Sequence, residues 1–570
     1  MTQTLIGKFL YLFLDELVKH GKNKPTDASL HIYIYYMFIY NLSNLMTIKT
    51  KPYTEELNIQ LPLWYAFLRR KFRNLQNKDN LLDNLVFYGT KAMLDQMFKD
   101  ENVLKNKNIK LDYGIENNKN VENIYIYINE FAYLHYESRI AMFNEPPFEN
   151  KTVSFNDGFK ADLNVWDNNT SDPTKWVELI TPSGTITHPI VHNGVTFNMP
   201  YIDENKSDSY KTQRYLGNVW GTHNGFSVKS SNDRLNIIDI TQLVPQKWEE
   251  PEKYTDLKRE MEYLLDIYSK LGDFEKNIAD LFAGSGKTNV PPPGQMLIIG
   301  NMMSQKYNQS QLDEIAMYFS LACGLFDSSI TAWWYKAKLR QARPVTLIRH
   351  YYKNQIVKSW TFNRGVQDID GGSWLPYQII TFDTPPFPDM ASGHTVFSTT
   401  GCKLLQWWFN TDTLYDGVTT VNIPNIGLWS NVLDQSQKEF LIGEFCIRKD
   451  KSEIEQCVVP NKDIKLTFNT LTDFYKACGK SRVYGGIHSE STNQLSQTIA
   501  GDVYEKTKSK LMTLNIKPTR PSSARATSPV GLRAFTPNGP NPETKTPPLM
   551  AGTGRCAGEH ARSAAHPRTP

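Results

Sequence analysis

The chain has 570 residues, of which 40% are hydrophobic, 12% aromatic and 21% charged, a composition that suits a folded protein with a large core and excludes an intrinsically disordered one. The formal net charge is +4, and no basic block stands out in the sequence. A phosphodiester backbone would need such a block, so we expect no nucleic-acid partner, and any basic site must be local.

Neither the cysteines nor the apolar runs indicate a zinc site, a membrane span or a secretory signal. The six cysteines form no CxxC pair and show no zinc-type spacing. Cys446 and Cys457 flank a charged turn and could form a disulfide in an oxidising compartment, but free thiols are the better interpretation. The apolar stretches from Phe9 to Leu14 and from Ile32 to Leu45 are too short for a signal sequence or a membrane helix. We therefore predict a soluble, cytoplasmic protein.

Helical periodicity dominates the first half of the chain. Apolar residues recur at three- and four-residue spacing from Leu10 to Val18 and from Asp27 to Met46, which predicts two helices. Between Val177 and Pro200, short alternating runs are broken by Pro-Ser-Gly and Asn-Gly, which indicates a small hairpin or an irregular segment. Residues 1–256 are thus predicted to form an N-terminal helical half, with a β-like segment near 177–200, that supplies core rather than chemistry.

A second helical half is predicted over residues 257–515. Its helices are separated by a proline-rich break after Gly284 and by a polar, partly β-like stretch between residues 410 and 470. The expected helices cover Leu257 to Phe282, Gln311 to Ala342, Ser392 to Phe409 and Glu490 to Leu511. Beyond Ile516 the composition changes to Pro, Ala, Arg, Thr and Gly, so residues 516–570 are predicted to form a disordered tail.

The segment Gly284-Ser-Gly-Lys-Thr288 resembles the end of a phosphate-binding loop. Such a loop needs a further glycine five residues before Gly286, where this chain has Leu281, and a helix directly afterwards, where this chain has prolines. We therefore predict no nucleotide site at this segment.

Three short motifs contain the candidate functional residues, and the first combines two cations. Lys336 and Arg343 are seven residues apart in Lys-Ala-Lys-Leu-Arg-Gln-Ala-Arg-Pro, so both should project from one face of a helix that ends at Pro344. Lys338 and Arg340 lie between them, and a solvated basic face is the simpler interpretation of this motif alone.

The second motif is a proline-rich approach to a helix start, Thr384-Pro-Pro-Phe-Pro-Asp-Met-Ala-Ser392-Gly393-His394. Ser392 can cap the helix, whose first N–H groups and dipole favour an anion, and Gly393 lets a ligand approach the backbone closely. His394 would then lie in the first turn, beside that anion. Taken alone, such a histidine more often packs or caps.

The third motif is Ser481-Arg482-Val-Tyr-Gly-Gly-Ile-His488. Its glycine pair lets Arg482 and His488 point to one place although their spacing does not fit one helix face. A neutral imidazole suits direct bonding to an electrophilic phosphorus or vanadium. Each motif is weak singly, but the three together predict one site for a tetrahedral oxyanion of phosphate or vanadate shape.

The ordered set of Lys-x6-Arg-Pro, Ser-Gly-His and Ser-Arg-x5-His resembles the signature shared by vanadium-dependent haloperoxidases, type-2 phosphatidic-acid phosphatases and bacterial acid phosphatases. The haloperoxidase group is the more similar, through Thr384 to Pro388, Trp333 to Tyr335 and Pro292 to Gly294, in patches from about residue 8 to residue 510. The resemblance implies an all-α fold of two packed helical bundles with small β additions.

By this resemblance, vanadate is the expected cofactor. The residues expected to hold it are Lys336, Arg343, Ser392, Gly393, Arg482 and His488. His488 would be the axial ligand, the three cations would neutralise the vanadate oxygens, and Ser392 with the Gly393 N–H would hydrogen-bond them. His394 would be the acid and base in the reaction with hydrogen peroxide, and Lys336 would polarise the peroxide. The expected partners are hydrogen peroxide, halide and a small organic acceptor.

Trp333 and Phe387 match aromatic positions beside the halide path in chloride-oxidising members, with simple core packing as their alternative role. Two positions depart from the family pattern. Thr492 stands four residues after His488, where an Asp often orients the ring, and Ala391 stands where Pro is usual before Ser-Gly-His. These departures leave the tuning of His488 open.

Two further functions fit the same residues. In a phosphomonoesterase, His488 would attack phosphorus to give a phospho-histidine and His394 would protonate the leaving alcohol, because vanadate and phosphate make the same demands of shape and charge. A non-catalytic oxyanion-binding or scaffold protein is the third interpretation, and the intact set of charged residues and histidines argues against it. The sequence therefore predicts a vanadate-dependent haloperoxidase, with the phosphatase as the alternative.

Overall fold

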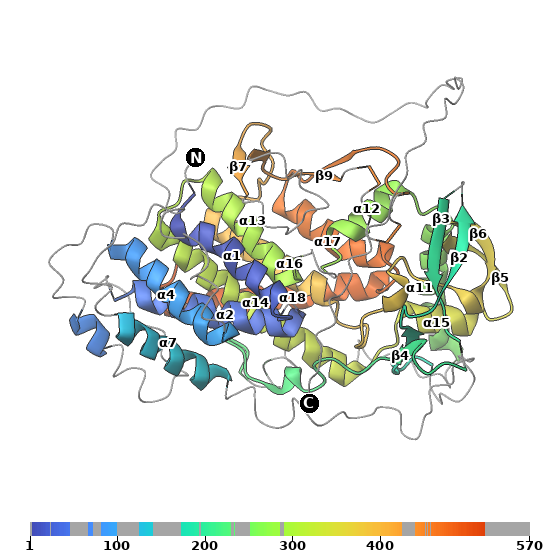
Figure 1. Cartoon of the computed structure of the whole chain (residues 1–570), viewed down its shortest axis with the longest axis horizontal. Coiled ribbons are helices and arrows are strands. Elements are labelled where there is room, and N and C mark those ends of the chain that lie inside the picture. Colours follow the sequence, from blue (N-terminus) through green and yellow to red (C-terminus); the bar gives the residue numbers. More distant parts are fainter. Residues whose placement is uncertain are drawn as a thin grey trace, which may run out of the picture. The chain divides into compact units, whose positions relative to one another are not determined.

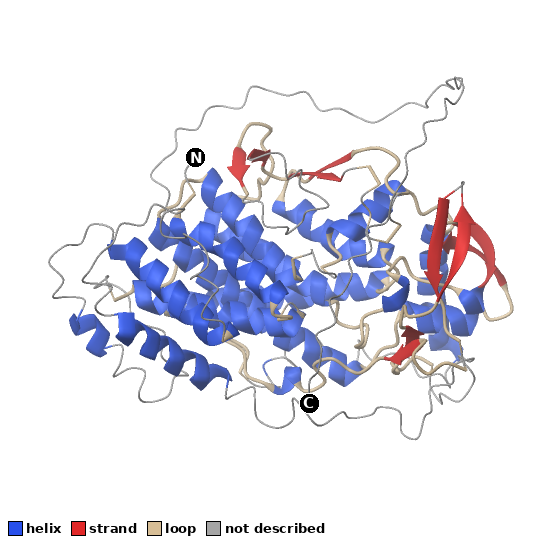
Figure 2. Cartoon of the chain, in the orientation of Figure 1, coloured by secondary structure: helices blue, strands red, loops and turns tan. Residues whose placement is uncertain are grey.

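Helices predominate in the part of the chain that the computed structural model describes (Figure 2). The described residues are 3–22, 24–45, 66–71, 81–99, 125–140, 173–192, 195–203, 205–229, 233, 251–284, 290–423, 439–447, 449–450, 452, 454–455 and 458–518. Residues 285–288 of the loop lookalike, Cys457, and residues 519–570 of the predicted tail lie outside these ranges. Cys446 is a free thiol.

The N-terminal half contributes the first helices of the described chain. They are α1 (Leu5–Lys19), α2 (Pro25–Ser43), α4 (Leu81–Phe98) and α7 (Tyr125–Ile140). Helix α1 begins where the Thr4 hydroxyl oxygen accepts the N–H of Gly7, and α2 begins with Pro25, whose missing N–H costs nothing at that position. Both helices predicted near the N-terminus are confirmed.

The central bundle is built around α14 (Gln311–Leu339), which contacts α2, α13, α16 and α18 (Figure 1). Its other members are α13 (Pro292–Lys306), α16 (Gly393–Phe409), α17 (Leu471–Tyr484) and α18 (Glu490–Thr513). Among the described helices, α14 alone is long and apolar enough to cross a membrane, and 94% of its most apolar stretch is buried inside the protein. Because other helices pack against several sides of α14, most of its positions are apolar.

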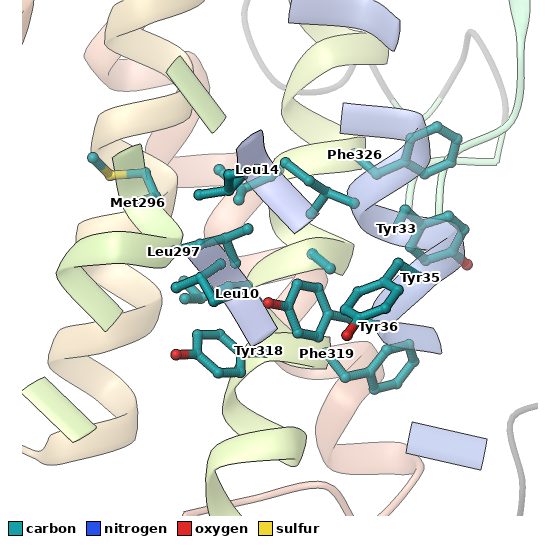
Figure 3. Close-up of a cluster of buried hydrophobic side chains, with 14 of the residues drawn as sticks. Leu10, Leu14, Tyr33, Tyr35, Tyr36, Met296, Leu297, Tyr318, Phe319 and Phe326 are labelled. Carbon is teal, nitrogen blue, oxygen red and sulfur yellow. The ribbon is translucent and has the colours of Figure 1, made fainter. Parts of the chain in front are cut away.

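Aromatic and aliphatic side chains fill the core between α1, α2 and the central bundle (Figure 3). Tyr33 stacks on Phe326 with ring centroids 4.5 Å apart, and Phe13 stacks on Tyr35 at 4.4 Å. Such pairs add about 0.5–1.5 kcal/mol each to the stabilisation from burying their area. This core joins the two predicted halves of the chain and braces α14, whose last turn contains Lys336. The boundary predicted between residues 256 and 257 stays a prediction.

A second apolar cluster forms around α11 (Pro251–Tyr268), α12 (Asp273–Leu281) and α15 (Pro344–Tyr351). The helix predicted from Leu257 to Phe282 is divided between α11 and α12 at Gly272, which has an extended backbone conformation. The Gly272 N–H donates to the carboxylate of Glu275, and this bond starts the second helix.

The strands form two-stranded antiparallel sheets at the margins of the helices (Figure 2). Strand β2 (Thr187–His192) pairs with β3 (Val195–Pro200), so the hairpin predicted within 177–200 is present. The other pairs are β1 (Ile180–Pro182) with β4 (Tyr210–Thr212), β5 (Ile356–Thr361) with β6 (Gly365–Asp370), β7 (Thr420–Asn422) with β8 (Glu439–Leu441), and β9 (Glu444–Ile447) with β10 (Ile464–Thr467). The predicted helical fold class with small β additions is confirmed.

The folded body extends beyond the point where the sequence predicted the tail to begin. Ile516 is 4% exposed and belongs to the main apolar core, and its N–H donates to Leu511 O at 2.9 Å. Ile516 lies three positions after the end of α18 and was assigned to the wrong segment, because the change of composition becomes clear only after it. The disorder predicted for residues 519–570 stays a prediction.

Candidate oxyanion site

The three sequence motifs meet where α14 ends, α16 begins and α17 passes into α18. The Arg343 guanidinium joins them. Its Nε donates to Phe387 O at 2.9 Å, and its Nη1 lies 2.7 Å from Ile487 O and 3.2 Å from His488 Nε2. Arg343 therefore contacts the proline-rich loop and the histidine of the third motif directly.

Lys336 and Arg343 do not share one helix face, contrary to the sequence prediction. Lys336 lies in the last turn of α14, which ends at Leu339 and is followed by Arg340 in a left-handed conformation with φ +49°. Arg343 instead precedes α15, and Pro344 occupies the first position of that helix. The fixed φ of proline suits a helix start as well as a stop, so the sequence signal was assigned to the wrong helix.

Lys336 is fully buried, and its ammonium group reaches the proline-rich loop. Nζ donates to Pro388 O at 2.7 Å and to Asp389 O at 3.0 Å, and an ammonium has a third N–H to offer a ligand. Burial and then the charge of Arg343 hold the pKa of Lys336 well below its ordinary value, although Asp389 raises it. A nearby anion would therefore stabilise the charged form of Lys336.

The second motif forms the N-terminus of α16, as predicted. The Ser392 Oγ accepts from Thr395 N at 3.4 Å and from Thr395 Oγ1 at 3.0 Å, which leaves its own O–H available to donate. Gly393 is the first residue of the helix, where an N–H has no carbonyl one turn earlier. Within the described part of the chain, the nearest atom to a Cβ at Gly393 would be a ring carbon of Trp333 at 3.5 Å. Packing therefore does not require glycine here, whereas a ligand against the backbone would.

His394 lies in the first turn of α16 and is half-buried. Its Nε2 is 3.3 Å from the carbonyl oxygen of Ala283, and a Cβ at Gly284 would lie 3.4 Å from the same nitrogen. Desolvation, followed by the charges of Arg482 and His488, holds the pKa of His394 well below its ordinary value. A neutral ring in this position can accept a proton.

Arg482 and His488 flank the turn that ends α17. Gly486 has φ +67°, and a Cβ there would lie 2.3 Å from the Tyr268 hydroxyl, so this turn requires glycine. Arg482 Nη2 donates to Ala279 O at 2.7 Å, and burial lowers the pKa of Arg482 to about 10. His488 is also buried, and its pKa is held well below the ordinary value by burial and then by the surrounding cations.

The ring of His488 is held by a carboxylate that the sequence analysis did not assign to the site. His488 Nδ1 is hydrogen-bonded to Asp389 Oδ1, and both side chains are buried. Burial raises the pKa of Asp389 to about 6, against the lowering effect of Arg343. The available signal was an acidic residue in the loop that leads to Ser-Gly-His, but no spacing rule connects it to His488.

Trp333 and Phe387 lie against each other beside the cations. Their ring centroids are 5.0 Å apart, and Lys336 Nζ lies 4.8 Å from the centroid of Phe387 and 5.7 Å from that of Trp333. Both rings are buried, and the Trp333 indole N–H donates to Leu216 O at 2.8 Å. The surface that they present to Lys336 is therefore apolar.

Positive charge exceeds the negative charge that faces it in this group of side chains. We call the buried cations Lys336, Arg343 and Arg482 the cationic cage. Asp389 opposes the first two and Asp280 the third. Arg343 Nη2 is buried and has no hydrogen-bond partner within the described residues, a loss worth about 1–3 kcal/mol. A tetrahedral oxyanion would satisfy this donor and balance the charge, so the residues present fit vanadate or phosphate.

One domain model and several solved structures are similar to this chain. Residues 316–515, which include all three motifs, match the family model described as the VCPO second helical-bundle domain. No curated protein matches the chain in sequence.

Three solved structures share the fold. The holo-type bacterial vanadium-dependent chloroperoxidase gives a TM-score of 0.54 at 17% identity, covering 86% of this chain and 93% of that one. The apo-type enzyme gives 0.55 at 16% identity, covering 86% and 95%. The first bacterial vanadium-dependent iodoperoxidase gives 0.53 at 13% identity, covering 90% and 97%. Together with the domain model, this shared fold confirms the resemblance predicted from the sequence.

Proposed function

We propose that this chain, which has the fold and the second helical-bundle domain of the vanadium haloperoxidases, is a vanadate-dependent haloperoxidase that oxidises halide with hydrogen peroxide to hypohalous acid. The main support is the cationic cage beside His488, whose Nε2 offers a lone pair at the same place. Three buried cations face only two carboxylates, Asp389 and Asp280, and buried charge that is not fully paired is costly, so an anion suits this site.

Vanadate would be held by His488 Nε2, by the cationic cage, and by the Ser392 hydroxyl and the Gly393 N–H. The cage would neutralise the oxygens, and the two neutral donors would fix the orientation. When bound, vanadate supplies a Lewis acid that makes peroxide reactive toward halide.

His394 would move the protons of the reaction. Hydrogen peroxide, halide and one proton give hypohalous acid and water, so a group must deliver a proton to the departing oxygen. The neutral ring of the half-buried His394 can take the proton from peroxide and return it in this step. A bound anion would raise the pKa of His394 toward neutrality and so make the uptake of the proton from peroxide easier.

The apolar side formed by Trp333 and Phe387 favours halide oxidation. A weakly hydrated halide loses little on entering such a surface, whereas an alcohol leaving group would find no hydrogen bonds there. The hypohalous acid would then react with a small organic acceptor.

A phosphomonoesterase is the second candidate function, because the bond between Asp389 and His488 also suits a nucleophilic histidine. With Nδ1 bonded to the carboxylate, Nε2 is left to attack phosphorus, and His394 would protonate the leaving alcohol.

One pair of assays separates the two reactions. Purified protein is loaded with orthovanadate and given peroxide with iodide, bromide or chloride and a phenolic dye, and the vanadate-free protein is given a chromogenic phosphomonoester. We expect halogenation that depends on vanadate, and vanadate inhibition of any esterase activity. Brisk ester hydrolysis without halogenation by the loaded protein between about pH 4 and 8 would replace the first function by the second.

A further inference from the structure

We propose that Asp389 is the positioning residue for His488, and that this chain supplies the orienting carboxylate from the loop before α16 instead of from position 492 on α18. The inference rests on the proposed role of His488 as the group that contacts the oxyanion. Position 492, one helical turn after His488, has a threonine, which has no carboxylate to orient the ring.

Two contacts assign the proton on the His488 ring. Arg343 Nη1 lies 3.2 Å from Nε2, and a guanidinium has only donors, so Nε2 must accept this hydrogen bond. The remaining nitrogen, Nδ1, then carries the hydrogen and donates it to the carboxylate of Asp389. Arg343 and Asp389 therefore favour the same tautomer, in which the Nε2 lone pair faces the cationic cage.

Asp389 is itself held from three directions. Its Oδ2 accepts from the hydroxyl of Thr492 at 3.2 Å and from the amide of Gln341 at 3.4 Å. Its backbone N–H donates to Gln341 O at 3.0 Å, and its backbone carbonyl accepts from Lys336 Nζ at 3.0 Å. A carboxylate fixed in this way can hold the ring in one orientation, as an unsupported surface carboxylate could not.

The position of Thr492 would allow a carboxylate on α18 to take the place of the Asp389 carboxylate. It lies one helical turn after His488, and its hydroxyl contacts the carboxylate of Asp389. A carboxylate at 492 would start from the same place on α18, within reach of the space that the Asp389 side chain occupies. Moving the carboxylate from position 389 to position 492 should therefore restore the orientation of the ring.

The test compares Asp389→Ala with the double variant Asp389→Ala/Thr492→Asp. Binding of orthovanadate and, separately, of inorganic phosphate is measured by equilibrium dialysis. The ring tautomer of His488 is read in the vanadate-free protein from the 15N shifts of its imidazole. We expect the single variant to bind vanadate about 10–100-fold more weakly, with a mixture of tautomers. The double variant should recover most of the affinity and the single tautomer.

Two controls isolate the effect. Asp389→Ala/Thr492→Val places a side chain without a hydrogen-bond acceptor at position 492 and should not restore the tautomer. Asp383→Ala removes another buried carboxylate of the same loop, which pairs with Arg349 and not with His488, so it should leave vanadate affinity unchanged.

The proposal is wrong if Asp389→Ala keeps both the wild-type affinity and the single tautomer, or if Asp383→Ala loses as much affinity. Absence of halogenation from a wild-type protein that binds vanadate would reject the haloperoxidase function and leave the role of Asp389 standing. A protein whose wild-type form binds neither oxyanion would overturn both.

Discussion

Replacing Arg343 with methionine should weaken vanadate binding by about 3 kcal/mol, roughly 150-fold, because it removes one cation of the cage together with its donors. A hydrogen bond to a charged group is worth about 1.5–3 kcal/mol. Among the described residues, the buried Nη2 of Arg343 has no partner, and Nη1 lies 3.2 Å from His488 Nε2, the atom proposed to bind vanadium. Methionine keeps most of the length of the side chain and none of its donors.

The same substitution should change the stability of the vanadate-free protein much less. It leaves the carbonyls of Phe387 and Ile487 without their donor, at about 1–3 kcal/mol each. In the other direction, burial lowers the pKa of Arg343 to about 10. Removing such a poorly solvated cation recovers free energy on the order of 3 kcal/mol. The two effects have opposite signs and similar sizes, so unfolding should not account for the loss of vanadate affinity.

Thermal unfolding at increasing orthovanadate concentration measures this difference. At 100 times its Kd, vanadate should stabilise the wild-type protein by about 2.7 kcal/mol, and the same concentration should stabilise the variant by only about 0.3 kcal/mol. Arg349→Met is the matched control, because Arg349 is a buried arginine of α15 that faces Asp383, with Nη2 3.7 Å from Oδ2. Equal stabilisation of wild-type and Arg343→Met proteins would refute the reasoning, and an equal loss in Arg349→Met would reveal an unspecific effect of removing charge.

Three further outcomes are expected. His488→Ala should abolish vanadate binding while His394→Ala keeps most of it and loses turnover, and equal losses of affinity in dialysis would contradict that division of roles. Because desolvation and Arg482 hold the pKa of His394 below its unfolded value of about 6.5, the contribution of its neutral ring to stability is complete above that pH and is lost as the pH falls. In denaturant unfolding, the free energy of unfolding should therefore fall less between pH 7.5 and pH 5.5 for His394→Ala than for the wild-type protein. A chain ending at Pro518 should melt like the full chain, whereas one that also lacks the buried Ile516 should melt lower, and equal melting of the two truncations would contradict the packing of that residue.

Helix positions were predictable wherever the apolar repeat continued over several turns and a local cap marked an end. The helix predicted from Gln311 to Ala342 begins at Gln311 in the structure, where the Ser310 hydroxyl oxygen accepts the N–H of Asp313. The predicted end at Ala342 is three residues too late, because Arg340 adopts a left-handed conformation. An arginine at that position does not predict this conformation. The division at Gly272 was missed for a similar reason, since the apolar repeat resumes directly after it.

The functional residues were predictable to the extent that each belongs to a short motif. Arg343, Gly393 and His488 could be found without a structure because their neighbours in sequence define their signatures. Asp389 has no such signature, because its contact with His488 joins positions 99 residues apart. Thr492 departs from the expected acidic residue, and its hydroxyl donates to the carboxylate of Asp389, which we propose orients the ring instead. A departure from a family motif can therefore indicate a substitution elsewhere in space.

The protonation states of the site depend on one another, and this dependence bears on the choice of reaction. The groups whose pKa values are held below their ordinary values are Lys336, Arg343, His394, Arg482 and His488. Burial contributes to every one of these shifts, and neighbouring cations add to those of Lys336 and both histidines, so a single oxyanion would raise all five pKa values together. Vanadate and phosphate would do so alike, because they have the same shape. The cage therefore favours an oxyanion without selecting a reaction. We propose that the selection comes from the apolar surface of Trp333 and Phe387, which would favour a weakly hydrated halide over an alcohol that needs hydrogen bonds.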